Sequence, residues 1–250
     1  MKSIRTRNIY NKDQDKPFEI SRSKFENYLK CKRCFYLDRV KGVNFPSTPP
    51  FTLNNLVDEL LKREFDTYRL QKKSHPLFKK INFNGVPFQH EKLDEWRESR
   101  TKGIKYEDKK NNLILKGGID DLWLDLDTNK IVIVDYKATS KKDGVPDDIL
   151  EQPFYGAYKN QLDFYGWLFK KNKFDVSDDG YFLFCNGSHL KQEFNAVMDF
   201  DYKFIHHKIN TDWIDDEIGN MKKVLDSDEI PRVKDECEFC TYSQTIINFK

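Results

Sequence analysis

Long apolar runs are missing from this chain of 250 residues. No stretch approaches the roughly 20 consecutive apolar residues that a membrane-spanning helix needs, so the sequence predicts no membrane segment. The first residues are basic and polar and lack the hydrophobic part of a secretory signal, which favours the cytoplasm of the source cell, or of a host if the gene is viral. The chain also has no glycine-rich phosphate loop, which argues against an ATPase.

The chain also lacks a large excess of positive charge. The formal net charge is only +2, so the chain has no global basic signature for nucleic acid. Any groove for nucleic acid must therefore come from local clusters of basic residues. Pairs of lysines stand at 72–73, 79–80, 109–110, 141–142 and 170–171, and each pair by itself is typical of an ordinary solvated surface.

Two strands joined by a turn are predicted between Gly117 and Lys137. The first strand carries apolar residues from Ile119 to Leu126, and the turn at residues 127–130 is rich in residues that tolerate tight backbone geometry. The second strand begins with the β-branched run 131–134, which is typical of a strand buried on both faces. It is expected to end in the polar triplet 135–137.

The ends of these strands bring two carboxylates together. Antiparallel pairing places Asp120 close to Asp135, and two neighbouring carboxylates repel each other unless a cation lies between them. Oxygen ligands favour a hard ion such as magnesium or manganese. Lys137 leaves the same face of the strand as Asp135. An acid pair beside an ammonium is suited to metal-assisted phosphodiester hydrolysis. In the alternative interpretation, the triplet is a solvated strand end and each aspartate caps a turn.

A longer pattern extends from this hairpin into the next predicted helix. The series Gly117-Gly118-Ile119-Asp120 is followed by Asp135-Tyr136-Lys137, and then by Gln161 and Tyr165, which share a helix face. This order resembles the RecB-like branch of the PD-(D/E)XK nuclease superfamily, whose pattern is G-x-x-D, [DE]-x-K and Q-x-x-x-Y.

The resemblance implies a role for each residue of the pattern. The metal ligands would be Asp120, Asp135 and the backbone carbonyl of Tyr136. Lys137 would be the catalytic lysine, which positions the attacking water or stabilises the developing negative charge. The side chains of Gln161 and Tyr165 would line the active site and the substrate groove. For Tyr165, a place at the edge of the core is the alternative.

The helix predicted from about Leu53 to Leu70 supplies a further candidate ligand. Its apolar residues recur at helical spacing. RecB-like exonucleases often carry a histidine in this helix as an extra metal ligand, and Asp58 stands in that position here. Asp58 borders the apolar face, whereas Glu59 points nearly opposite. We therefore take Asp58 as a candidate third ligand, with a solvated helix acid as the alternative.

Pairs of cysteines stand near both ends of the chain. Five cysteines without a secretory signal indicate metal ligands or buried thiols rather than disulfides. Cys31 and Cys34 share a face of one predicted helix, and Cys237 and Cys240 repeat the same spacing. Four thiolates are enough to close a tetrahedral metal site. Cys185 lies inside an apolar run and is expected to be a core thiol.

The cysteine pairs are also similar to those of the iron–sulfur members of this branch, such as the CRISPR-associated exonucleases and AddB-type subunits. These proteins use one N-terminal and three C-terminal cysteines. Three of the four positions match Cys31, Cys237 and Cys240, and Cys34 is the candidate for the fourth. The resemblance implies a [4Fe–4S] cluster, which we take as the prediction. The symmetric C-x-x-C pairs favour zinc as the alternative, and four unliganded thiols are a third possibility.

The expected fold is α/β, with a restriction-endonuclease-like core in which helices flank a mixed β-sheet. A cysteine-ligated accessory lobe joins the N- and C-termini. We expect a flexible basic arm at residues 1–17 and a single nuclease domain at residues 18–250. Its core would span about 51–205, and the lobe would combine about 21–42 with 231–250. Further elements are expected as a helix from about Leu150 to Lys171, strands at about Gly180–Cys185 and Glu193–Phe200, and a helix from about Asp212 to Leu225.

The function that the resemblance implies is a magnesium- or manganese-dependent deoxyribonuclease. We expect an exonuclease that acts on single-stranded DNA ends or flaps and leaves a 5′-phosphate. The polar loop at 138–144 is well placed to contact a DNA backbone. DNA repair is the expected process, with helicase, CRISPR or phage replication proteins as candidate partners and no membrane. The alternative is a non-catalytic DNA-binding or scaffold subunit of such a complex, and hydrolysis of RNA is a third possibility.

Overall fold

The computed structural model describes residues 4–46, 49–247 and 249. The described residues form two compact units. Unit 1 draws on Met1–Thr48, Lys105–Lys116 and Asp212–Lys250, and unit 2 on Pro49–Ile104 and Gly117–Thr211. Residues 1–3 of the expected arm and residues 248 and 250 of the expected lobe lie outside the described part. In that part, none of the helices combines the length and apolar character that crossing a membrane requires.

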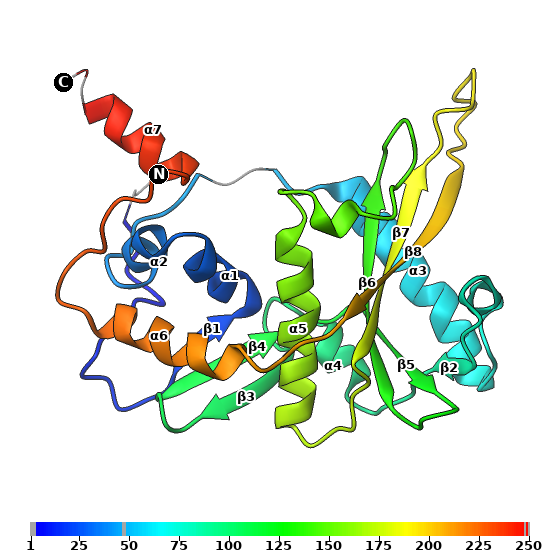
Figure 1. Cartoon of the computed structure of the whole chain (residues 1–250), viewed down its shortest axis with the longest axis horizontal. Helices are drawn as coiled ribbons and strands as arrows, with labels where there is room; N and C mark the ends of the chain where they lie inside the picture. The colour runs from blue at the N-terminus through cyan, green and yellow to red at the C-terminus, as the bar shows by residue number, and fades with distance from the viewer. Residues whose placement is uncertain (1–3, 47–48, 248, 250) are drawn as a thin grey trace. The chain divides into compact units, whose positions relative to one another are not determined.

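Unit 2 is centred on a five-stranded sheet with the order β2-β5-β6-β7-β8 (Figure 1). The pairing is antiparallel between β5 and β6 and between β7 and β8, and parallel between β6 and β7. A parallel pair needs a long crossover connection, which contains helix α5. The strands are β2 Gly85–Pro87, β5 Asp121–Asp125, β6 Ile131–Thr139, β7 Asp179–Gly187 and β8 Phe200–Lys208.

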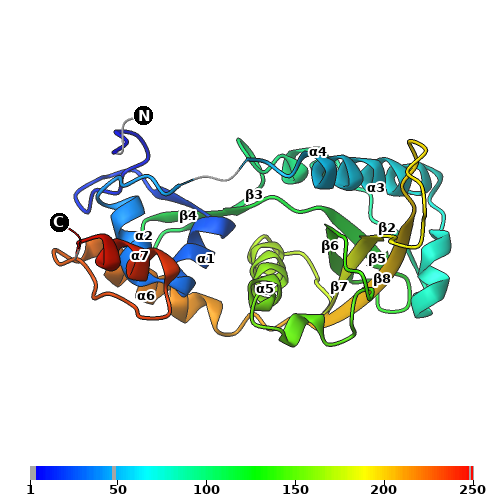
Figure 2. The ribbon, with the colours of Figure 1, turned by 90° about the horizontal axis from the view of Figure 1, so that it is seen from above.

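Two long helices cover opposite faces of this sheet, as Figures 1 and 2 show from two directions. On one face, Phe65 of α3 stacks on Trp123 of β5 with ring centroids 5.7 Å apart. On the other, Tyr158 of α5 packs against Phe182 of β7, also at 5.7 Å. The predicted mixed sheet flanked by helices is therefore confirmed. The helices of unit 2 are α3 Thr52–Gln71, α4 Leu93–Arg97 and α5 Gly156–Lys171, with short 3-10 turns η1 Pro76–Ile81 and η2 Ile149–Glu151.

The predicted hairpin around the acid pair is present as β5 and β6. Asp121 lies opposite Val134, which confirms the antiparallel pairing, and residues 131–136 of β6 are all buried. One expectation was wrong: the strand does not end at the polar triplet but continues to Thr139. The ladder with β7 extends to Thr139, and the polar side chains of Asp135 and Lys137 find partners inside unit 2.

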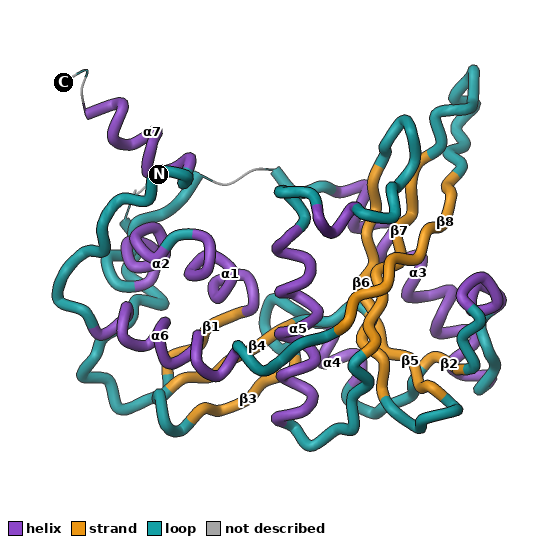
Figure 3. The backbone as a smooth tube through the Cα atoms, in the orientation of Figure 1, coloured by secondary structure: helices purple, strands orange, loops and turns teal. Residues whose placement is uncertain are grey.

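Two other boundaries differ from the expectation. Helix α5 begins at Gly156 rather than near Leu150, since the residue before Pro153 is extended, as sterics favour before a proline. Of the strand expected at Glu193–Phe200, residues 193–199 lie in the connection between β7 and β8, which Figure 3 shows as loop, and Phe200 begins β8. Strand β8 lies at the edge of the sheet and is mostly not buried, so its sequence lacks the apolar signal of a core strand.

Helix α3 confirms the predicted helix, but its apolar residues divide into two groups. Leu61 and Phe65 are buried against the sheet. Leu53, Leu56 and Leu60 are 49%, 47% and 50% exposed. The periodicity of the sequence therefore identified the helix correctly and overstated the width of its buried face.

Unit 1 is built from both ends of the chain around a three-stranded sheet with the order β1-β4-β3. The Tyr28 hydroxyl donates to the Glu217 carboxylate at 2.8 Å, and the Tyr36 hydroxyl donates to the Ser227 carbonyl at 3.0 Å. These contacts join the N- and C-terminal segments. The elements are β1 Phe18–Ser21, α1 Arg22–Lys30, α2 Lys32–Arg39, β3 Ile104–Asp108, β4 Leu113–Gly117, α6 Ile214–Asp226 and α7 Glu238–Ile247.

Unit 1 also departs from the expectation at its N-terminus. The helix expected to carry both N-terminal cysteines is two helices, because the backbone is extended at Cys31, with φ −157° and ψ 108°. Part of the segment expected as a flexible arm makes contacts in unit 1. Tyr10 is buried and its hydroxyl donates to Asp226 at 2.5 Å, and Arg5 forms an ion pair with Asp38.

Candidate functional site

A pocket of about 310 Å³ in unit 2 gathers most of the residues that the sequence singles out. Helix α3, Asp120 just before β5, strand β6 and helix α5 contribute to it. A pocket of this volume is at the lower end of the range typical of small-ligand sites. Its lining residues are Asn54, Asn55, Val57, Asp58, Leu61, Asp120, Asp135, Tyr136, Lys137, Ala138, Tyr158 and Gln161.

The two predicted carboxylates meet because of the strand register. Asp121 lies opposite Val134, so one step further along the hairpin Asp120 faces Asp135. The backbone N–H of Tyr136 donates to Asp120 Oδ2 at 2.9 Å. Asp135 is 1% exposed. Burial by itself would raise the pKa of Asp120, but the positive charges of Lys62 and Lys137 hold it below its usual value.

Lys137 lies beside these acids, as its spacing predicts. Its ammonium forms an ion pair with Asp135, donates to Gln161 Oε1 at 3.2 Å and lies 4.5 Å from the ring centroid of Tyr158. Burial by itself would lower the pKa of Lys137, but the charges of Asp135 and Asp120 raise it above its usual value. The side chain is therefore a cation at neutral pH, and it is suited to stabilising negative charge.

Asp58 also reaches the pocket, where it contacts Lys62, a residue that was not among the predicted site residues. The Lys62 ammonium lies 2.7 Å from Asp58 Oδ2 and 3.4 Å from Asp120 Oδ1. Burial and the charge of Asp120 raise the pKa of Asp58. Among the described residues, Asp58 Oδ1 is buried without a hydrogen-bond partner. The sequence feature that could have identified Lys62 as a pocket residue is its position four residues after Asp58, which places both side chains on one helix face.

Gln161 and Tyr165 lie one turn apart on α5 and contact each other. The Gln161 amide donates to Asp135 Oδ1 at 2.6 Å and to the Tyr165 hydroxyl at 3.2 Å, so it orients Asp135. Gln161 lines the pocket, whereas Tyr165 is 4% exposed and lies behind Gln161. A Cβ atom at Gly117 would lie 2.6 Å from the Tyr165 ring. The glycine of the G-x-x-D pattern therefore makes room for this tyrosine.

A buried network that the sequence did not predict supports the acid pair from behind. Asp121, fully buried, accepts from the Tyr136 hydroxyl at 2.7 Å and from Arg97 at 2.9 Å, and it forms an ion pair with Arg69. Arg97 also donates to the backbone carbonyl of Asp120 at 3.1 Å. Adjacent strand residues point to opposite faces, so the Asp120-Asp121 doublet indicated that only one of the two acids could face the pocket.

The donor set of the pocket suits a hard divalent cation. Three carboxylates, those of Asp58, Asp120 and Asp135, converge there, and one of their buried oxygens lacks a hydrogen-bond partner among the described residues. Carboxylate oxygens are the ligands that magnesium and manganese prefer. That the backbone carbonyl of Tyr136 is a further metal ligand stays a prediction.

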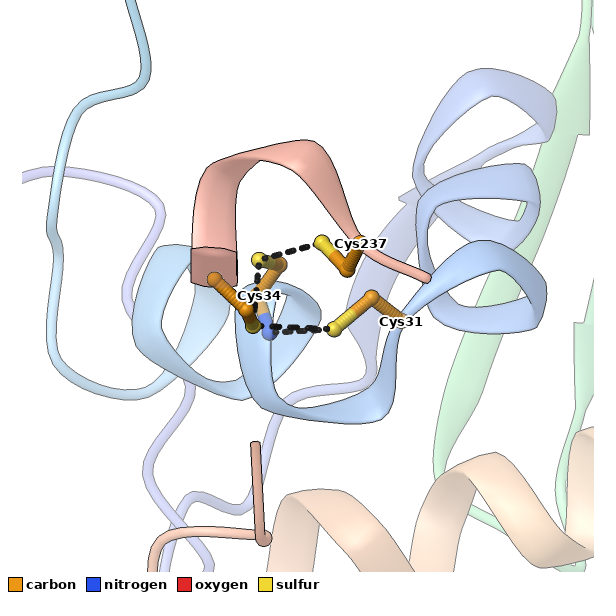
Figure 4. Close-up of side chains that lie close together, drawn as sticks. Cys31, Cys34 and Cys237 are labelled. Atoms are coloured by element: carbon orange, nitrogen blue, oxygen red, sulfur yellow. Dashed lines mark hydrogen bonds between the residues drawn. The ribbon is translucent and has the colours of Figure 1, made fainter. Parts of the chain in front are cut away.

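The four cysteines near the chain ends come together in unit 1. Figure 4 shows Cys31, Cys34 and Cys237 of this set side by side. Cys31 directly precedes α2 and Cys237 directly precedes α7, while Cys34 and Cys240 lie in the first turns of these helices. The four sulfur atoms lie within 4.8 Å of one another. None of the five cysteines, all of them in the described part, forms a disulfide, and Cys185 is buried in unit 2, as expected of a core residue. The predicted set of four is thus in place to bind a metal.

Comparison with known families agrees with this geometry. The family model of the PD-(D/E)XK nuclease superfamily matches residues 49–245, which is more than half of the chain. The matched range contains all of unit 2, including every residue that lines the pocket. A comparison with curated proteins finds no match.

Proposed function

The chain belongs to the PD-(D/E)XK nuclease superfamily, and we propose that it is a magnesium- or manganese-dependent deoxyribonuclease. The observation that carries the proposal is the convergence of Asp120, Asp135, Lys137 and Gln161 in one pocket. Placing two carboxylates and a lysine together in a pocket is costly, because the carboxylates repel each other and all three charged groups lose water. A non-catalytic scaffold gains nothing from this cost.

Each residue has a role in this proposal. Asp120, Asp135 and the backbone carbonyl of Tyr136 hold the metal, and Asp58 is a candidate third carboxylate ligand. When bound, the ion supplies an activated water and stabilises negative charge on the phosphate. The ammonium of Lys137 positions that water or stabilises the developing charge.

Gln161 and Tyr165 complete the proposed site. Gln161 holds Asp135 in place through its amide, and Tyr165 supports Gln161 from behind. We propose that Gln161 and Tyr165 assist in placing the substrate, and that Tyr165 does so through Gln161.

The finer proposal concerns the substrate. Resemblance to the RecB-like branch supports an exonuclease on single-stranded DNA ends or flaps, with a 5′-phosphate product, in DNA repair. The loop after β6 carries Lys141 and Lys142 close in sequence to the pocket residue Ala138, which supports contact with the DNA backbone there. Helicase, CRISPR or phage replication proteins are the proposed partners.

The test is a nuclease assay on end-labelled single- and double-stranded DNA, with manganese or with chelator. We expect metal-dependent cutting that Lys137→Ala lowers by about 10²-fold or more, the scale of losing one electrostatic stabiliser in an active site. Lys102→Ala, at an exposed lysine, is the matched control and should cut like the wild type. Binding of DNA by folded wild-type protein without cutting of either substrate would overturn the proposal in favour of the non-catalytic scaffold.

A further inference from the structure

We propose that the four clustered cysteines bind one zinc ion, and that this site does not hold the iron–sulfur cluster that the family resemblance implies. The inference concerns unit 1 and does not depend on the proposed nuclease activity. It rests on the spacing of the sulfur atoms of Cys31, Cys34, Cys237 and Cys240.

The sulfur atoms are spaced as ligands of a single ion. Zinc–sulfur bonds of about 2.3 Å in tetrahedral directions place the sulfur atoms about 3.8 Å apart. The separations are 3.7 Å between Cys31 and Cys240, 3.5 Å between Cys34 and Cys237, and 3.8 Å between Cys34 and Cys240. The four atoms therefore already surround a centre of the right size for zinc.

The same spacing does not fit a cubane cluster. In a [4Fe–4S] cluster each cysteine binds a different iron, so the iron and sulfide atoms lie between the cysteine sulfurs and hold them further apart. Here all four sulfur atoms lie within 4.8 Å of one another, which leaves no room for that body of atoms.

The local backbone agrees with zinc as well. Each C-x-x-C pair lies at the start of a helix, α2 or α7, and the backbone N–H of Cys34 donates to the sulfur of Cys31 at 3.5 Å. Two such pairs, separated in sequence, form the two-plus-two ligand set of many structural zinc sites. The one-plus-three arrangement of the iron–sulfur members of the resembled branch lacks its last position here, because none of residues 241–250 is a cysteine.

The ion would hold the end of the chain in unit 1. Cys240 is the only buried residue of the described α7, while Phe239 and Tyr242 are 48% and 69% exposed. In the described part of the chain, Phe239 also packs edge-on against Phe45 at 5.1 Å, and Lys234 donates to the Lys30 carbonyl at 3.0 Å. Removal of the metal should therefore release α7 before it affects the rest of unit 1.

The test is the metal content of full-length protein purified without oxygen from cells supplied with both iron and zinc. Oxygen can destroy an iron–sulfur cluster, and zinc can then occupy the emptied site. Excluding oxygen prevents this false result. We expect one zinc per chain, no acid-labile sulfide and no visible absorption of an iron–sulfur chromophore. Four irons with sulfide, or a chain free of metal with four titratable thiols at this site, would overturn the proposal.

A pair of variants tests the ligands. Cys34→Ser should lower zinc retention at least tenfold against the chromogenic chelator 4-(2-pyridylazo)resorcinol and should make α7 sensitive to limited proteolysis. Cys185→Ala, which removes the core thiol outside the site, should keep one zinc and the protection of α7. Equal zinc retention in the two variants would contradict the assignment, and the metal content of the wild type decides the question even if Cys34→Ser does not fold.

Discussion

Replacing Lys62 by methionine should tighten the binding of a divalent cation in the pocket. Lys62 places its ammonium 2.7 Å from Asp58 and 3.4 Å from Asp120, and its side chain is 19% exposed. With Asp135 and Lys137, the group holds three carboxylates and two ammonium groups, a formal charge of −1. The substitution changes this charge to −2 and removes a cation that competes with the metal for two of its candidate ligands.

The size of the effect follows from Coulomb's law. Two unit charges 4 Å apart interact by about 4 kcal/mol at an effective dielectric constant of about 20, and by about 1 kcal/mol in water. Lys62 is partly exposed and its ammonium can move when an ion binds, so we take a repulsion between Lys62 and the bound cation near the lower of these two energies. About 1.4 kcal/mol corresponds to a tenfold lower dissociation constant. Methionine keeps much of the apolar stem of the lysine, so packing of α3 should change little.

The measurement is a manganese titration of folded protein, followed by electron paramagnetic resonance, which needs no nuclease activity. Lys62→Arg keeps the charge and serves as the control, with a dissociation constant within about threefold of the wild type. Without metal, Lys62→Met should also melt at a lower temperature, because Asp58 loses its counterion, and manganese should restore part of the difference. An unchanged or weaker manganese affinity in Lys62→Met would refute the view that Lys62 competes for the cation position.

Two further predictions concern a glycine and a buried acid. Gly117→Ala should cost about 1–3 kcal/mol of unfolding free energy and lower nuclease activity, because its Cβ must displace the Tyr165 ring; wild-type values in urea unfolding and in the nuclease assay would contradict this. Burial by itself would raise the pKa of Asp38, but hydrogen bonds from Arg39 and Arg5 lower it to about 2. Because this pKa is below the unfolded value of about 3.9, Asp38 adds about 2 kcal/mol of stability above pH 4 that is lost as the pH falls toward 2. Asp38→Asn should therefore be less stable than the wild type at pH 7 by about that amount and should lose less stability between pH 4 and pH 2; a difference that stays constant with pH would contradict this account.

The acid pair could be predicted from sequence because local rules fix it. A β-branched run, a four-residue turn and a preceding apolar strand determine the register, and the register places Asp120 opposite Asp135. Lys137 follows from the alternation of side chains along a strand. These relations act over a few residues, so a single sequence contains them. The branch of the superfamily stays a prediction, as do the roles of the site residues.

The supporting network could not be predicted in the same way. Arg69 and Arg97 reach Asp121 from separate helices, α3 and α4, and nothing in their local sequence indicates that shared partner. The same holds for the pairing of β1 with β4, which lie far apart in the chain. The bounds of strand β8 could not be predicted for another reason. An edge strand that is mostly not buried carries little of the apolar pattern that is typical of a core strand. Long-range partners and edge strands are set by the whole fold.

The alternation of chain segments between the two units has a consequence for synthesis on the ribosome. Unit 2 is complete once Thr211 has emerged, whereas unit 1 still lacks α6 and α7 at that point. Cys34 precedes its partner Cys237 by 203 residues, so the second cysteine pair emerges long after the first. The nuclease pocket can therefore assemble during elongation, whereas the cysteine centre can close only after Cys240 has emerged.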